Sequence, residues 1–89
     1  MHEASLIADL LRQITAMMRQ QGTGRVVGVT VRLGALSHIS PDHFRAHFVY
    51  GARGTLAEGT RLTIEVGHDL GDPRAQDVVL DSLEVEVEE

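Results

Sequence analysis

The sequence predicts an α/β fold, a two-layer sandwich of two helices on a three-stranded sheet. Three observations support this prediction. Apolar residues recur with a helical period near the start of the chain, a Ser-Pro pair marks a second helix start, and three segments alternate apolar and polar residues as strands do. The expected order is helix, strand, helix, strand, strand. The order of the strands within the sheet stays open. With 89 residues, the chain is expected to form a single domain, 1–89.

The first helix is expected over residues 5–21, where apolar side chains recur at positions i, i+3, i+4 and i+7. One buried face is predicted to carry Leu6, Ile7, Leu10, Leu11, Ile14, Met17 and Met18. Gly22 and Gly24 follow as helix terminators, because glycine readily adopts the left-handed conformation of a C-terminal cap. We interpret the paired methionines as core residues and not as a soft metal site.

Three segments show the period of two that a strand with one buried face requires. In residues 25–33 the inward face is predicted to carry Val27, Val29, Val31 and Leu33, and the other face Val26, Gly28, Thr30 and Arg32. Residues 61–66 are expected to point Leu62, Ile64 and Val66 inward. In residues 78–88, Leu83, Val85 and Val87 alternate with an outward row of Glu84, Glu86 and Glu88. We interpret that row as a solvated face and not as a cation site.

A second helix is expected to begin at Pro41, because Ser40 is a good N-cap and proline fits the first helical position. It should continue to about Tyr50 and bury Phe44 and Phe48, which are four residues apart. A turn-rich connection, residues 51–59, then leads to the next strand.

His43 and His47 share the spacing of four, so both imidazoles could reach one metal ion. A zinc-protease helix would need glutamate directly after the first histidine, where this chain has Phe44, and a third ligand is not evident. We therefore interpret both histidines as surface or partly buried polar residues and expect no enzyme of this kind.

The composition excludes several classes of function. The net charge is −5, and all eight basic residues are arginine. The sequence therefore lacks the excess of positive charge that is typical of nucleic-acid-binding proteins. No apolar run is long enough to cross a membrane, because Asp9 and Arg12 interrupt the first one. The chain has no cysteine, so it can form neither a disulfide nor a cysteine zinc site. This is compatible with the reducing cytoplasm, where we expect the protein to act.

The first three residues, Met1, His2 and Glu3, can chelate one metal ion. The amine of Met1, the amides of His2 and Glu3 and the imidazole of His2 form fused chelate rings with four nearly coplanar nitrogens. Such a tetragonal nitrogen site suits Ni(II) or Cu(II) and not magnesium or calcium. The Glu3 carboxylate is not required as a ligand.

Several segments occur together in a fixed order: MHEASL at residue 1, RVVGVTVRLGALS at residue 25, RGTLAEGTRL at residue 53 and DSLEVEV at residue 81. In these segments the chain resembles the HypA/HybF family of nickel-insertion proteins for hydrogenase maturation. The resemblance implies a small, non-enzymatic carrier of Ni(II) for the maturation of nickel–iron hydrogenase or another nickel enzyme. The partners that it implies are a nickel-handling GTPase and the hydrogenase large subunit, and the chain could also form a homo-oligomer.

The chain departs from that family in one large respect. Family members carry a zinc domain with two Cys-x-x-Cys pairs, inserted before the last strand. Here only a short bridge, residues 67–77, spans the gap, so we expect no zinc. Some members add a ligand from the loop before the second helix, for which His38 and Asp42 are the closest candidates. His68 and Asp69, in the bridge, are interpreted as loop surface.

The exposed side of the first helix, beside the N-terminus, is the expected docking surface for the GTPase. Asp9, Arg12 and Gln13 are polar enough for a wet, transient interface. An alternative function is a protein-interaction or regulatory module that kept this surface but lost regulated metal handling. The missing zinc domain favours that alternative, and the intact Met1-His2-Glu3 start opposes it.

Overall fold

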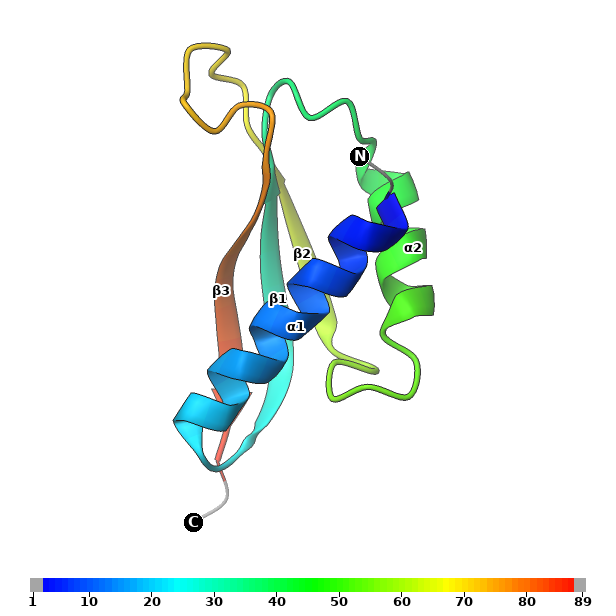
Figure 1. Cartoon of the computed structure of the whole chain (residues 1–89), viewed down its shortest axis with the longest axis vertical. Coiled ribbons are helices and arrows are strands. Elements are labelled where there is room, and N and C mark those ends of the chain that lie inside the picture. Colours follow the sequence, from blue (N-terminus) through cyan, green and yellow to red (C-terminus); the bar gives the residue numbers. More distant parts are fainter. Residues whose placement is uncertain (1–2, 88–89) are drawn as a thin grey trace.

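The computed structural model describes residues 3–87 and contains the expected elements in the expected order (Figure 1). They are α1 (Glu3–Gln21), β1 (Arg25–Leu33), α2 (Pro41–Gly51), β2 (Arg61–Val66) and β3 (Val78–Glu86). The prediction of two helices and a three-stranded sheet is therefore confirmed. Within the described part of the chain, no helix is both long and apolar enough to cross a membrane.

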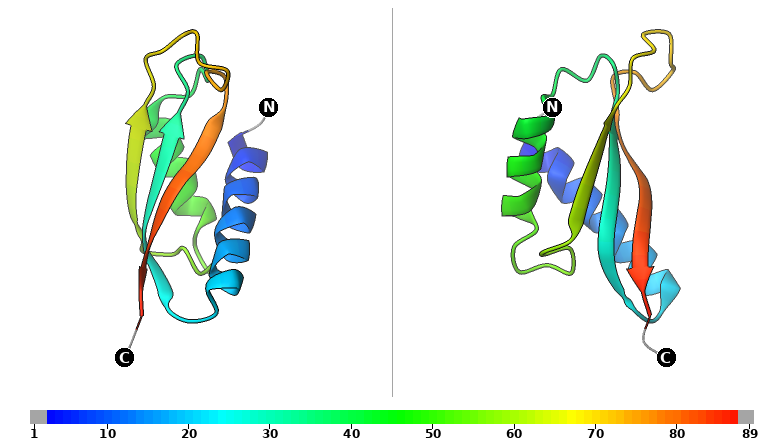
Figure 2. Two further views of the ribbon diagram at one scale, coloured as in Figure 1. Left: turned by 90° about the vertical axis from the view of Figure 1, so that its left-hand side faces the viewer. Right: turned by 180° about the vertical axis from the view of Figure 1, so that it is seen from behind.

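The sheet has the strand order β2-β1-β3, with β1 in the middle. β1 pairs in parallel with β2 and antiparallel with β3. The parallel pair is connected through α2, as a parallel crossover requires. Both helices lie on one face of the sheet, α2 near β2 and α1 near β3 (Figure 2). The opposite face of the sheet is open to solvent.

The core lies between the helices and the covered face of the sheet. Its buried apolar residues come from every element except β3: Leu6, Ile7, Leu10, Ile14, Val26, Val29, Val31, Leu33, Phe44, Phe48, Ala52, Ala57 and Leu62. β3 adds partly buried side chains. The prediction that Phe44 and Phe48 are buried is confirmed. Ser40 caps α2 as expected, because its Oγ accepts a hydrogen bond from the His43 amide at 3.1 Å.

The predicted apolar face of α1 is correct in its first half and wrong at Met17, whose side chain is 44% exposed. The reason is the path of the helix. α1 runs diagonally across the sheet, so its last turns lie away from α2 (Figure 1). Leu11 and Met18 are only partly buried against the core.

The predicted faces of β1 are wrong at its first residues. The pairing with β3 shifts between Val26 and Gly28, which leaves Val27 as the extra residue of a β-bulge. The bulge reverses the alternation, so Val26 is buried in the core and Val27 is only half-buried. Two residues predicted to point inward at strand ends, Val66 and Val87, are also exposed, because no helix covers them.

Candidate metal and partner site

The expected nickel ligands lie at the start of α1. Met1 and His2 are outside the described residues, and the side chain of Glu3 is not described. Glu3 is the first residue of α1. The first amides of an α-helix have no acceptor within the helix. A metal that takes the Glu3 amide nitrogen would therefore break no hydrogen bond of α1.

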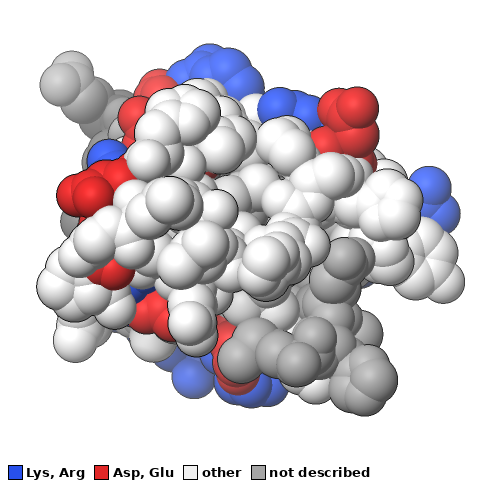
Figure 3. All heavy atoms as spheres, turned by 90° about the horizontal axis from the view of Figure 1, so that it is seen from above, with Lys and Arg blue, Asp and Glu red and all other residues white. Residues whose placement is uncertain are grey.

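A cleft of about 900 Å³ lies beside the first three turns of α1. The cleft is bounded by α1, by the loop before α2 and by the end of the bridge, through Leu6, Asp9, Leu10, Gln13, Leu36, Ser37, His38, Ile39, Arg74, Gln76, Asp77 and Val78. Figure 3 looks down on this end of the molecule. Side chains other than Lys, Arg, Asp and Glu occupy the centre of the view, and acidic and basic side chains lie around its margin. The lining of the cleft itself mixes apolar side chains, such as Leu6 and Ile39, with polar and charged ones, such as Gln13 and Asp77.

Of the three residues expected to bind a partner, two line this cleft. Asp9 and Gln13 form part of its α1 wall, whereas Arg12 is not among its lining residues. Arg12 forms an ion pair with Asp9 one turn earlier, and both side chains are more than half exposed. Because an exposed pair is screened by water and salt, it can exchange readily for contacts with another protein.

The two candidate supplementary ligands separate in the structure. His38 lines the cleft, and its backbone has φ = 59°, a left-handed conformation that few residues other than glycine adopt. Asp42 lies in the first turn of α2 and does not line the cleft. Of the two, His38 is therefore the one that lies at the cleft beside α1. The sequence could not distinguish them, because both flank Ser40 at equal distance.

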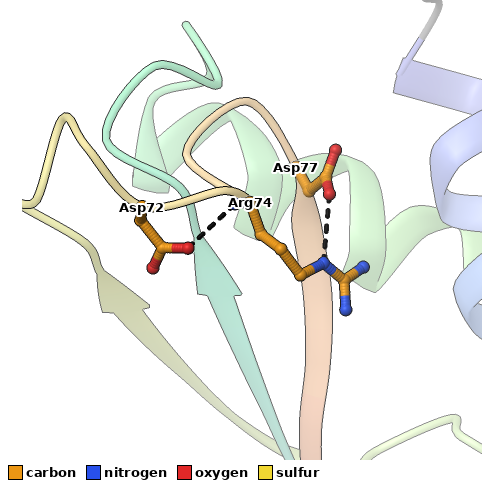
Figure 4. Close-up of polar contacts among 3 residues, drawn as sticks. All are labelled: Asp72, Arg74 and Asp77. Carbon is orange, nitrogen blue, oxygen red and sulfur yellow. Dashed lines mark hydrogen bonds and ion pairs between the residues drawn. The ribbon is translucent and has the colours of Figure 1, made fainter.

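The bridge, residues 67–77, is a tightly hydrogen-bonded loop (Figure 4). The Asp72 carboxylate accepts a hydrogen bond from the Arg74 amide at 2.8 Å, and the Arg74 Nε donates to the Asp77 carboxylate at 3.1 Å. Asp69 accepts from the Gly71 amide at 2.9 Å. Each aspartate thus satisfies a backbone or side-chain donor of the loop.

The bridge is also fixed to the end of β1. The Gly34 amide donates to the Asp77 carbonyl at 2.9 Å, and the Leu36 amide donates to the Ala75 carbonyl at 2.7 Å. Ala75 is buried, and a Cβ on Gly34 would overlap the Ala75 carbonyl. Because Leu36 begins the segment that leads to His38, the bridge supports the loop that forms one wall of the cleft. Sequence reasoning missed Arg74 and Asp77 as cleft residues. Their only signal was the Asp and Arg content of the bridge.

The other histidines do not assemble a metal site. His43 and His47 are exposed on α2, as expected, with ring centroids 6.1 Å apart. His68 and Asp69 are exposed in the bridge, as also expected. Among residues 3–87, no three histidine, aspartate or glutamate side chains lie close enough together to hold a metal ion.

Comparisons with a family model and with curated proteins both point to one family. A family model described as "Hydrogenase/urease nickel incorporation, metallochaperone, hypA" matches residues 1–69. The chain is 42% identical over 66 residues to the hydrogenase maturation factor HypA of Methylocella silvestris, covering 74% of this chain and 58% of that protein. It is 40% identical over 65 residues to the HypA of Chlorobium limicola, covering 73% and 56%. The chain thus spans little more than half the length of these relatives.

A solved structure shows the same fold. The solution structure of the Ni metallochaperone HypA from Helicobacter pylori superimposes with a TM-score of 0.81, at 17% identity, over 99% of this chain and 100% of that one. The matched family model and the curated relatives establish the family. The chain belongs to the HypA family of hydrogenase and urease nickel-incorporation proteins.

Proposed function

We propose that this protein is a nickel metallochaperone that delivers Ni(II) for the maturation of a nickel–iron hydrogenase or another nickel enzyme. The observation that carries the proposal is membership of the HypA family through residues 1–69, which include the Met-His-Glu start. Ni(II) is the cargo of the protein and not a resident cofactor. The proposed role is transport and transfer, without catalysis of a covalent reaction.

In the proposed site, Met1 provides its amine, His2 its amide and imidazole nitrogens, and Glu3 its amide. The position of α1 supports this set of donors. The N-terminus of a helix carries a partial positive charge, which favours a deprotonated amide there. Because the ligands must lose protons before they bind, nickel affinity should rise with pH. His38, across the cleft, is the proposed supplementary ligand.

The first prediction concerns nickel binding by the untagged protein. Nickel titration should show about one ion per chain, with the absorbance of a planar nitrogen site. One additional residue before Met1 moves the chelating amine, and His2→Ala removes the imidazole. Each change should abolish that absorbance.

Glu3→Gln is the matched control for this experiment, because it keeps the amide and removes only a carboxylate that the site does not require. The control should retain the planar spectrum. If the extended protein and the His2→Ala variant bind as the parent does, the proposed site is wrong. Titration at a series of pH values should show affinity rising from acidic to neutral solution.

We propose that the partner is a nickel-handling GTPase, which docks on the polar wall of the cleft. A partner bound there would lie beside the start of α1, so the metal could pass to it without entering bulk water. The hydrogenase large subunit is the proposed final recipient.

The second prediction tests that docking surface. Arg12→Glu removes the ion pair with Asp9 and places two acidic side chains one turn apart on α1, one of them at the cleft and the other beside it. Calorimetric titration against the cognate GTPase should show affinity reduced roughly tenfold, as expected for about 1.4 kcal/mol. Arg19→Glu, an exposed substitution in the last turn of α1, is the control and should bind normally. An unchanged affinity for Arg12→Glu would place the interface elsewhere.

The alternative function is an interaction module that has lost regulated metal handling. The structural observation that favours it is the bridge, which is closed by its own hydrogen bonds at the place where we propose that longer relatives insert a zinc domain. The two functions differ in the nickel titration. A parent protein that binds its GTPase but shows no N-terminal nickel site would be a module of this second kind.

A further inference from the structure

The outer edge of β2 is a free edge of the sheet. Within residues 3–87, β2 pairs only with β1, and no other element lies beyond its outer edge when the open face is viewed (Figure 2, left). The other edge strand, β3, has α1 packed beside it. Because an uncovered strand edge presents unpaired backbone donors and acceptors, a further strand can add to it.

Alternate residues of β2 point their backbone groups away from β1. The Gly67 amide donates to the Leu33 carbonyl at 2.8 Å, so the residues at odd positions of β2 also face β1. Those at even positions, such as Leu62 and Ile64, turn outward. In agreement with this, the Leu62 carbonyl accepts a hydrogen bond from the Arg45 side chain of α2 at 2.9 Å. A carbonyl oxygen has two lone pairs, so this carbonyl can also accept a hydrogen bond from another strand.

The open-face side chains of β2 are complementary to a second copy of the same strand. When two copies pair antiparallel about Thr63, Arg61 of each copy lies opposite Glu65 of the other. These opposite charges attract, whereas a pairing centred on Arg61 or on Glu65 would bring like charges together. Arg61 already contacts Glu84 of its own chain. Because a guanidinium has five donors, Arg61 can bind a carboxylate on each side.

The charges around this edge are balanced, unlike those around β3. Residues 41–66, which form α2, the following loop and β2, contain three arginines and three acidic residues. Residues 67–89, which include the bridge and β3, contain one arginine and eight acidic residues. Self-pairing through β3 would therefore bring two strongly acidic segments together. Self-pairing through β2 joins two segments without net charge.

The covered side of the same edge exposes apolar side chains. Val66 is 44% exposed, Ile64 is half-buried, and Val49 of α2 is 53% exposed. Val49 lies one turn after Arg45, on the side of α2 that faces the edge of β2. A two-fold axis through Thr63, perpendicular to the sheet, places both copies of α2 on the same face. These apolar side chains would then be covered by the second copy.

We propose that the protein forms a symmetric dimer in which the β2 strands of two copies pair antiparallel about Thr63, so that the two sheets become one. Backbone hydrogen bonds would join Leu62 of each copy to Ile64 of the other. Among the described residues that line the cleft beside α1, none belongs to β2, so the pairing does not use the proposed docking wall. The association needs no nickel, so it can be measured on the metal-free protein and does not depend on the proposed function.

Sedimentation velocity of the metal-free chain at increasing concentration should show a transition from monomer to dimer. Arg61→Glu and Glu65→Arg should each raise the dimer dissociation constant roughly tenfold or more, because two attractive pairs become two repulsive ones. An equimolar mixture of the two variants should dimerise again, since every pair between them is opposite in charge. A variant that had only lost its fold would not recover on mixing.

Arg25→Glu and Glu86→Arg are the matched controls for the charge variants. They reverse the members of another exposed ion pair on the open face, between β1 and β3. Both should dimerise as the parent does, and all variants should keep the parent's circular dichroism spectrum.

A single introduced cysteine tests the register. Thr63 would lie opposite its own copy in a pair without hydrogen bonds, where the Cα atoms are about 4.5 Å apart, within the range of a disulfide. The chain has no cysteine. Mild oxidation of Thr63→Cys should therefore give a covalent dimer, whereas Ser82→Cys, on the open face of β3, should stay monomeric in a denaturing gel. A monomer at every concentration, a dimer that both charge variants retain, or equal cross-linking at the two positions would overturn the proposal.

Discussion

The sheet has one face covered by the two helices and one face open to solvent, and the central strand β1 contributes side chains to both. On the covered face, Val29, Val31 and Leu33 are almost fully buried beneath the helices. On the open face the charged side chains pair across strands. The pairs are Arg25 with Glu86 at 3.4 Å, Arg61 with Glu84 at 2.5 Å and Arg32 with Glu65 at 3.7 Å.

The difference shows where stability comes from in this small domain. Burial of apolar area stabilises the fold by about 25 cal/mol for each Å² removed from water. Ion pairs in water contribute little, because solvent and salt screen both partners. The covered face therefore holds the fold together, and the ion pairs of the open face add little to its stability.

Ile14→Ala should cause the largest loss of stability. Ile14 is fully buried between α1 and the sheet, so truncation removes apolar contacts and leaves a cavity. The free energy of unfolding, measured with urea, should fall by about 2–5 kcal/mol. Met17→Ala in the same helix is the control, because the Met17 side chain is 44% exposed. If both variants lost equal stability, burial would not be the cause.

Gly34→Ala should cause an intermediate loss of stability. Gly34 lies where β1 ends and the bridge packs against it. The added Cβ would overlap the Ala75 carbonyl, so the bridge must move away. We expect a loss of about 1–3 kcal/mol and faster hydrogen exchange at the Leu36 amide, which donates to Ala75. Gly67→Ala is the matched control, since its Cβ would meet only ordinary contacts from 3.5 Å outward. Unchanged exchange at Leu36 would contradict the inference that the bridge supports the loop before α2.

Arg61→Gln should have the smallest effect, a slight loss of stability at neutral pH that disappears in acid. Gly28 lies between the two partners in β1, and its lack of a side chain lets Arg61 reach Glu84 across the middle strand. The hydrogen bond and the charge of Arg61 lower the pKa of Glu84 below its ordinary value near 4.5, and Glu84 in turn raises the pKa of Arg61.

A lowered carboxyl pKa stabilises the fold above the pKa of the unfolded chain, and this stability is lost as pH falls through the folded value. Arg61→Gln should therefore lower stability slightly at neutral pH, where the pair is charged. The difference from the parent should shrink as pH falls below about 4.5, so the variant loses less stability on acidification. Carbon NMR of the Glu84 carboxyl should show its pKa returning toward the ordinary value. A pKa that stays low in the variant would mean that another group holds it there.

Much of the fold could be predicted from local patterns, and the errors have identifiable causes. Ser40-Pro41 and the Phe44–Phe48 pair predicted α2 correctly, because caps and helical spacing are local properties. Alternation could not predict the bulge at Val27, which depends on the pairing of β1 with a strand about 50 residues later. Spacing placed Met17 in the core, but burial also depends on how far α2 extends beside α1.

The sequence by itself determined the type and order of the elements, the absence of a cysteine zinc site and the family resemblance carried by the Met-His-Glu start. These follow from periodicity, composition and short motifs, which need no knowledge of long-range contacts. Only the tertiary structure decided the strand order β2-β1-β3, the support of the His38 loop by the bridge, and the cleft that Asp9 and Gln13 share with it. The physical reason is that residues distant in sequence meet only when their backbones pack, as Gly34 and Ala75 do at the end of β1.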